Sequence, residues 1–132
     1  MEFDSRMLLK EIHKDDRGTL WTLTHNNHEY LLMETNKGYS RGGDYHKSIQ
    51  HDVVLSGVVV FTSIKDGIEK VKPLGVGDKI TFEPINPHMV TSITDSLILE
   101  WLEGDFEKAY YEPYRKIIEK GKEKYPSCGC GE

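Results

Sequence analysis

Short apolar segments alternate with turn-forming residues over most of the chain, from residue 18 to residue 102. Within residues 79–83, Ile80 and Phe82 share one side of an extended chain and polar residues share the other, the two-residue period of a half-buried strand. Glycine, asparagine, aspartate and proline separate the segments and favour tight reversals. The pattern predicts an antiparallel sandwich or barrel. The predicted strands are residues 19–23, 29–35, 51–55, 58–64, 79–83, 88–93 and 97–102.

The pattern changes after Trp101, where charged and aromatic residues mix. Pro113 suits the start of a helix but not its interior, so we predict a helix from about Pro113 to Lys120 that Gly121 ends. We expect this helix to pack on the outside of the sheet or in a dimer contact. Its apolar stripe would consist of Tyr114, Ile117 and Ile118.

The length and composition favour one folded domain. The chain has 132 residues, and a single core commonly organises about 100 to 150 residues. Hydrophobic residues make up 37% and charged residues 30%, a balance in which a core and a solvated surface coexist. We therefore expect a soluble single domain over residues 1–132, with a barrel over about 15–102 and a helical appendage and tail over 103–132.

Charge, hydropathy and cysteine content argue against several classes of protein. The net charge is −5 and no block of lysine or arginine is present, so nucleic acid is not an expected partner. No run of 18 apolar residues and no stretch of signal-peptide type occur, so we expect no membrane partner and a cytoplasmic location. Cys128 and Cys130 alone cannot complete a four-ligand zinc site, and a loose thiol pair is expected.

Side chains that bind ligands are concentrated in residues 41–57, RGGDYHKSIQHDVVLSG. Asp44 and His46 are two residues apart, so on a strand both would project from one face. Gln50 follows after a short break, and His88 begins another predicted strand after a turn bounded by prolines. A site assembled from two distant strands fits an antiparallel barrel.

The spacing of these residues resembles the first motif of the cupin superfamily: glycine, five residues, H-x-H, three or four residues, glutamate, six residues and glycine. Asp44 stands at the position of the first histidine, and Gln50 at that of the glutamate. Every interval is reproduced by Gly38, Asp44, His46, Gln50 and Gly57.

The second cupin motif is matched in part. Gly77 and His88 occupy its glycine and histidine positions, while its proline, glycine and asparagine are replaced by Glu83, Ile85 and Ser92. The resemblance covers about residues 15–102. It implies an all-β fold, the cupin double-stranded β-helix or jelly-roll barrel, with the short C-terminal helix appended. Because cupins commonly pair through their sheets, it also implies a homodimer.

Two further strings resemble the sugar-nucleotide branch of the cupins, the dTDP-4-keto-6-deoxyglucose 3,4-ketoisomerases and the dTDP-4-dehydrorhamnose 3,5-epimerases. These strings are DDRG, which contains Arg17, and RGGDYHK, in which Arg41, His46 and Lys47 match and Asp44 replaces a histidine. The resemblance implies an isomerase or epimerase that acts on a nucleotide-linked keto sugar. Such chemistry removes a proton next to a carbonyl, and His46 would be the base.

The other residues receive roles from the same hypothesis. His88, or a tyrosine such as Tyr45 or Tyr39, would donate a hydrogen bond to the oxygen that gains negative charge. Asp44 would orient the imidazole or carry a second proton. The diphosphate would bind the planar guanidinium of Arg41 and then that of Arg17, with Lys47 at the rim.

A metal centre is the competing interpretation. Two imidazoles, a carboxylate and an amide suit iron, manganese, nickel or zinc, and His51 would replace Gln50 if a bulge shifted the register. The chain would then be a metal-dependent oxygenase or isomerase. A non-catalytic pocket for a small molecule is a third alternative, because a fold does not specify a function. No organic cofactor is expected. The candidate ligands are Asp44, His46, Gln50 and His88.

Overall fold

The computed structural model describes residues 7–104 and 108–123, so Cys128 and Cys130 lie outside the described residues. Among the residues described, no helix has the length and apolar character needed to cross a membrane. Strands dominate. They are β1 Leu8–Asp15, β2 Gly18–His25, β3 His28–Thr35, β4 Ser40–His46, β5 Ile49–Ser56, β6 Val59–Lys65, β7 Ile68–Leu74, β8 Lys79–Phe82, β9 His88–Ser92, β10 Ser96–Glu103 and β11 Lys108–Tyr110.

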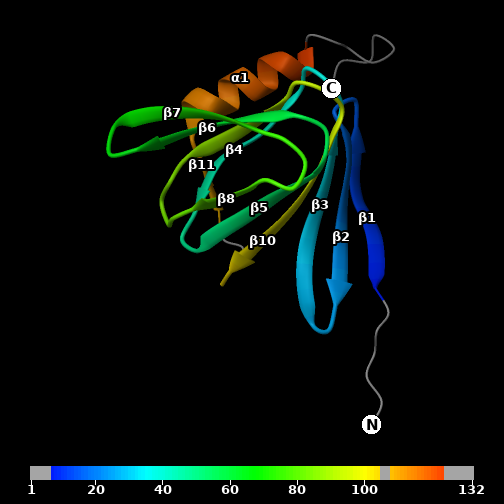
Figure 1. The fold of residues 1–132 in the computed structure, drawn as a ribbon. Helices are drawn as coiled ribbons and strands as arrows, with labels where there is room; N and C mark the ends of the chain where they lie inside the picture. Colours follow the sequence, from blue (N-terminus) through cyan, green and yellow to red (C-terminus); the bar gives the residue numbers. More distant parts are fainter. Residues whose placement is uncertain (1–6, 105–107, 124–132) are drawn as a thin grey trace.

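The strands form two antiparallel sheets that face each other (Figure 1). One has six strands in the order β1-β2-β3-β10-β5-β8, and the other has five in the order β11-β4-β9-β6-β7. Consecutive strands often belong to different sheets, as in a jelly roll. The predicted all-β jelly roll is confirmed. The core between the sheets consists of Met33, Val54, Val59, Phe61, Leu74, Phe82, Val90 and Ile98.

Each of the seven predicted strands corresponds to an observed strand, but β1, β4, β7 and β11 were not among the predicted ranges. β1 and β7 are edge strands whose side chains are exposed at nearly every position, so the apolar and polar alternation of a half-buried strand is missing. Strand pairing therefore reaches beyond both ends of the barrel range 15–102, from Leu8 of β1 to Tyr110 of β11.

Two of the hairpins have two-residue turns in which both residues have positive φ. Asn26 and Asn27 connect β2 to β3 with φ of 49° and 65°, and Asp66 and Gly67 connect β6 to β7 with φ of 53° and 74°. Positive φ at both central residues matches the twist of a hairpin, and Asn-Asn and Asp-Gly adopt it at low cost. These turns set the registers of both hairpins.

The C-terminal helix α1 spans Glu112–Glu123 and crosses the outer face of the five-stranded sheet (Figure 1). This confirms the expected packing on the outside of the sheet. The predicted end at Gly121 was wrong, because a glycine costs a helix only about 1 kcal/mol and nothing crowds this one. Ile117 was also misplaced and is 52% exposed. The buried stripe is Tyr114 and Ile118, which pack with Met89 of β9.

Candidate metal centre

A cavity of about 430 Å³ lies inside the barrel and is lined by both sheets and by α1. Apolar core residues form part of its wall, including Met33, Phe61 and Val90. The rest of the wall is polar and carries charges of both signs, so the cavity suits a small polar ligand. Predicted site residues in this wall are Arg17, Arg41, Asp44, His46, Gln50 and His88.

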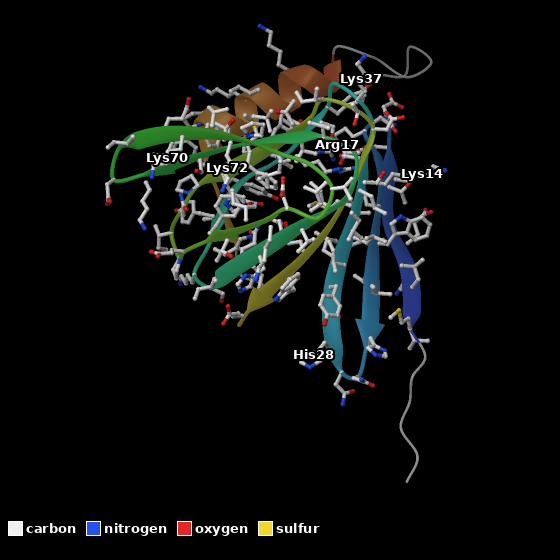
Figure 2. The ribbon with its side chains drawn as sticks, in the orientation of Figure 1. Lys14, Arg17, His28, Lys37, Lys70 and Lys72 are labelled. Atoms are coloured by element: carbon white, nitrogen blue, oxygen red, sulfur yellow. The ribbon has the colours of Figure 1, made fainter. Side chains whose placement is uncertain are left out.

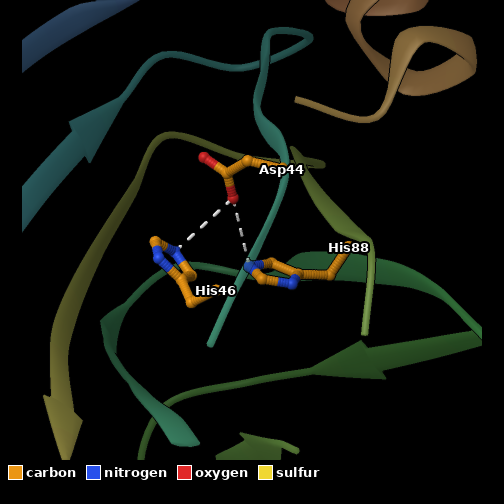
Figure 3. Close-up of side chains that lie close together, drawn as sticks. All are labelled: Asp44, His46 and His88. Carbon is orange, nitrogen blue, oxygen red and sulfur yellow. Dashed lines mark ion pairs between the residues drawn. The ribbon is translucent and has the colours of Figure 1, made fainter. Parts of the chain in front are cut away.

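Asp44, His46 and His88 converge on one point in the cavity (Figure 3). All three are buried. Oδ1 of Asp44 lies 3.7 Å from Nε2 of His46 and 3.5 Å from Nε2 of His88. One donor atom from each residue lies within 4.8 Å of the other two. The two sequence-distant histidines therefore share one site with the carboxylate.

The pairing of β4 with β9 produces this convergence. Asp44 is the register partner of His88, so the two side chains lie next to each other on the inner face of the sheet. His46 is two residues further along β4 and points the same way. A bulge between Gly42 and Asp44 shifts the register just before the site.

Gly43 lies within this bulge and allows α1 to approach it. Its φ is +74°, and a Cβ placed there would lie 2.9 Å from Cδ of Arg115 and 2.9 Å from Cδ1 of Ile118. The helix also binds the bulge directly, because Nη1 of Arg115 donates to the carbonyl of Gly42. The amide of Tyr111 donates to the carbonyl of Gly43. The C-terminal segment therefore supports the strand that carries Asp44.

The environment of His88 suits a metal ligand. The Nδ1 atom of His88 lies 2.8 Å from the carbonyl oxygen of Asn86, to which it donates, so Nε2 is left as the acceptor facing Asp44. The ring stacks on Phe82 with the centroids 4.2 Å apart. Burial lowers the pKa of His88, so its neutral form, the one that binds metals, is favoured.

Ile85, in the loop before β9, occupies the glycine position of the second cupin motif. Its φ is +59°, a conformation that strains a β-branched residue. The amide of Ile85 donates to the carbonyl of His46 at 2.8 Å. The strained loop thus joins the end of β4, which carries His46, to the start of β9, which carries His88.

Gln50 lies in the cavity wall beside two carboxyl groups. Its Nε2 donates to Oδ2 of Asp52 at 2.6 Å and to Oε1 of Glu100 at 3.0 Å. Its Oε1 is buried and has no hydrogen-bond partner among the described residues. Burial raises the pKa of Asp52 to about 6, although hydrogen bonds from Glu100 and Gln50 oppose the shift. Glu100 lines the cavity and was missed from the sequence.

Arg41 is 3% exposed and also lines the cavity. It donates from Nε to the hydroxyl of Thr35 and from Nη2 to the carbonyl of Glu34, but it forms no ion pair with any described residue. Burial and the nearby Arg17 lower the pKa of Arg41 to about 10, so it remains charged at pH 7. A buried cation without a carboxylate partner favours an anionic ligand.

Arg17 and Arg115 add two more guanidinium groups to the wall. Arg17 forms a bidentate ion pair with Asp15. Figure 2 shows Arg17 at the end of the molecule opposite the hairpin tip that carries His28. Burial opposes the ionisation of Asp15, but hydrogen bonds from Arg17 and His13 outweigh it and hold the pKa of Asp15 well below its usual range.

Some of the residues predicted from the sequence to belong to the site do not line the cavity. Lys47 is exposed and Tyr45 is half-buried, and neither they nor the buried Tyr39 line the cavity wall. His51 does not replace Gln50, because its ring stacks on Trp101 and forms a hydrogen bond with the hydroxyl of Thr81. His13, Glu100, Tyr110 and Arg115 line the cavity and were not predicted. No local motif marks these four, because sheet register and helix docking bring them there.

The donor set fits a divalent ion. Ligands bound at 2.0 to 2.2 Å in tetrahedral geometry lie about 3.3 to 3.6 Å apart. The distances of 3.7 and 3.5 Å from Asp44 to the two imidazoles are close to this range and longer than hydrogen bonds. The unpaired Oε1 of Gln50 offers a fourth donor atom, an oxygen, in the same cavity wall. Two imidazoles with carboxylate and amide oxygens suit first-row divalent ions.

Comparison with known proteins shows the fold. No protein-family model and no curated protein matches the chain. A deletion mutant of Bacillus subtilis oxalate decarboxylase matches 95% of this chain and 40% of its own, with a TM-score of 0.71 and 15% identity. CapF, a capsular polysaccharide assembling protein from Staphylococcus aureus, matches 83% of this chain and 32% of its own, with a TM-score of 0.62 and 16% identity.

Vicilin from hazelnut, Corylus avellana, matches 77% of this chain and 34% of its own, with a TM-score of 0.65 and 16% identity. The chain therefore spans less than half the length of each of these structures. All three are cupin-fold proteins, and their barrels match this one across most of its length. The chain has the cupin jelly-roll fold and carries a His/Asp group suited to a metal ion.

Proposed function

We propose that this chain is a metal-dependent cupin enzyme that acts on a small anionic molecule. Asp44, His46 and His88 hold a divalent ion of iron, manganese, nickel or zinc, with Gln50 as the fourth ligand. The observation that carries the proposal is the approach of three buried donor atoms to within 4.8 Å of one another in a cavity wall. One of the similar structures, oxalate decarboxylase, is described as having Mn(II) centres.

In this proposal, the side chains of the site have separate roles. The bound ion supplies Lewis acidity toward a substrate oxygen. Asp44 brings the negative charge that favours a cation, and the hydrogen bond from His88 to Asn86 fixes which nitrogen faces the site. Arg41 binds the anionic group of the substrate through its remaining N–H donors. The apolar wall excludes bulk water and strengthens these interactions.

Metal analysis of the full chain purified without chelators tests the proposal. We expect about one equivalent of a divalent ion, and His46→Ala or His88→Ala should lose it because each removes one of the few ligands. His28→Ala, at the exposed hairpin tip, is the matched control and should retain the ion. Less than about a tenth of an equivalent, together with no uptake of added Mn²⁺, Fe²⁺, Ni²⁺ or Zn²⁺, would reject the proposal.

A second candidate is an isomerase or epimerase of a nucleotide-linked keto sugar. Its support is the placement of Arg17 and Arg41 in the same cavity wall as His46. His46 would remove the proton next to the keto group, and His88 would donate to the oxygen that gains charge. Asp44 would orient His46, while Arg41 and Arg17 would bind the diphosphate.

Calorimetric titration of metal-free protein distinguishes the two candidates. The sugar-nucleotide candidate requires binding of dTDP, a dTDP-sugar or a UDP-sugar without any ion, weakened by Arg41→Gln. Binding that needs the ion, or binding only of small carboxylates and phosphates, favours the metal enzyme. A retained ion together with a tightly held ligand and no turnover would indicate a non-catalytic binding protein.

A further inference from the structure

The strongest feature outside the predicted ligand set is the pair of carboxyl groups behind Gln50. Asp52 of β5 and Glu100 of β10 are register partners on neighbouring strands, so their side chains lie next to each other. Asp52 is fully buried, and Glu100 is 8% exposed in the cavity wall. Two acidic groups taken out of water at adjacent positions are costly, and such groups commonly persist for a function.

The pair determines how the amide of Gln50 is oriented. An amide nitrogen has two hydrogens, and here one is accepted by Asp52 and the other by Glu100. Turning the amide over would place its oxygen against two carboxyl oxygens at 2.6 and 3.0 Å, the present positions of those acceptors. This arrangement would lose both hydrogen bonds and add repulsion between oxygens. The carboxyl pair therefore holds the oxygen on the side away from itself.

The oxygen of Gln50 is then available to a ligand. It is buried, it has no partner among the described residues, and its residue lines the same cavity as Asp44, His46 and His88. On the neighbouring strand, Gln50 is the register partner of Phe82, whose ring stacks on His88. A buried acceptor without a donor is costly unless a cation or a ligand satisfies it.

We propose that Asp52 and Glu100 are positioning residues for the metal centre, which lock the amide of Gln50 with Oε1 toward the ion. This inference rests on the proposed metal site. It explains how a glutamine serves at a ligand position, because fixed hydrogen bonds present its oxygen and withdraw its N–H groups. The negative charge of the site then includes the carboxyl groups of Asp52 and Glu100, which lie behind Gln50 and do not bind the ion themselves.

Co²⁺ titration of metal-free full-length chain tests this inference through affinity and through the d–d absorption of the bound ion. Asp52→Asn offers Gln50 a new donor, so the amide can turn over and present N–H groups to the ion. We expect Asp52→Asn and Glu100→Gln to bind Co²⁺ about 10- to 100-fold more weakly, with altered absorption. Glu83→Gln removes an exposed carboxylate that is not in the cavity wall, and it should leave both readouts unchanged.

A double substitution separates the effect of the amide orientation on Co²⁺ affinity from the effect of losing a negative charge. In Gln50→Glu/Asp52→Asn the two functional groups are exchanged. The introduced asparagine can then donate to one oxygen of the introduced glutamate, while the other oxygen of that carboxylate faces the ion. We expect this double variant to bind Co²⁺ at least about tenfold more tightly than Asp52→Asn alone. If Asp52→Asn does not fold, the exchange Gln50→Glu/Glu100→Gln against Glu100→Gln makes the same comparison.

Each outcome decides one of the two claims. Wild-type affinity and absorption in both Asp52→Asn and Glu100→Gln would overturn the positioning role. Weakened binding that the exchange does not restore would also overturn it, because charge alone would then explain the loss. A wild-type chain that binds no Co²⁺ would instead reject the metal centre itself.

Discussion

Ile85 carries backbone strain beside the proposed metal centre. A β-branched residue in the left-handed region costs roughly 1 to 3 kcal/mol, whereas glycine adopts it freely. The side chain is 59% exposed, so removing it loses little apolar burial. We expect Ile85→Gly to increase the free energy of unfolding by about 1 kcal/mol in urea denaturation.

A matched glycine substitution separates relief of strain from other effects. Ile93 is similarly exposed, at 47%, but its φ is not positive. Ile93→Gly should therefore destabilise the chain by about 0.5 to 1 kcal/mol, through the greater freedom of the unfolded backbone. Equal destabilisation by both variants would show that Ile85 stores no strain.

Asp52 gives stability a predictable pH dependence. Its folded pKa of about 6 is raised above the ordinary value of 3.8. The protonated form is therefore favoured in the folded state, and its stabilising contribution is complete below about pH 4 and lost as the pH rises through about 6. Asp52→Asn cannot ionise, so the stability of this variant relative to wild type should increase by up to about 3 kcal/mol between pH 4 and pH 7.5.

Denaturant unfolding of metal-free protein at several pH values measures this difference. A wild-type minus Asp52→Asn difference that stays constant from pH 4 to pH 7.5 would show that burial does not hold the proton on Asp52.

At the scale of elements, the helix α1 and the bulge of β4 fit each other through Gly43. A methyl group there would meet Arg115 and Ile118 at 2.9 Å while φ stays at +74°. We expect Gly43→Ala to destabilise the chain by about 2 kcal/mol, as overpacking and a left-handed alanine combine. Metal affinity should also fall, because the bulge precedes Asp44.

Gly38 offers the control for this element-scale prediction. Its φ is +89°, but nothing lies within 4 Å of an added Cβ. Gly38→Ala should therefore show only the backbone cost and should leave metal affinity unchanged. If Gly43→Ala were no more harmful than Gly38→Ala, the helix would not depend on the bulge.

The sequence predicted those parts of the molecule that local pattern controls. Intervals within one strand placed Asp44 and His46 on one face, and asparagine between two predicted strands favoured the tight reversal that joins β2 to β3. Edge strands such as β1 have no alternation of apolar and polar residues, because neither face of the strand is buried. Glu100 and Arg115 reach the cavity only through register and helix docking, which no nearby residue encodes. The extension of α1 through Gly121 depends likewise on packing elsewhere along the helix.

At the scale of the whole molecule, the exposed edge of the six-stranded sheet bears on assembly. β1 is an edge strand with apolar side chains on the surface at Leu8, Leu9 and Ile12. Such an edge is a template for pairing with another chain. We expect light scattering to give a homodimer of twice the 15.2 kDa chain mass.

Lysines placed on β1 and on β7, an edge strand of the other sheet, distinguish the surface involved. Leu9→Lys should shift the mass toward 15.2 kDa, because a charge on β1 would be buried in the pair. Val71→Lys, on the exposed edge strand β7, should leave the dimer intact. A wild-type mass of 15.2 kDa at high protein concentration would contradict the dimer.

The proposed metal centre requires three side chains from β4 and β9 to share one ion. Anomalous diffraction from crystals of the full chain soaked in Mn²⁺ measures this directly. We predict a single strong peak in the barrel cavity, about 2.0 to 2.3 Å from Oδ1 of Asp44 and from Nε2 of His46 and His88. A fully soaked crystal with no peak at this position, or with the two imidazoles turned toward separate regions of solvent, would contradict it.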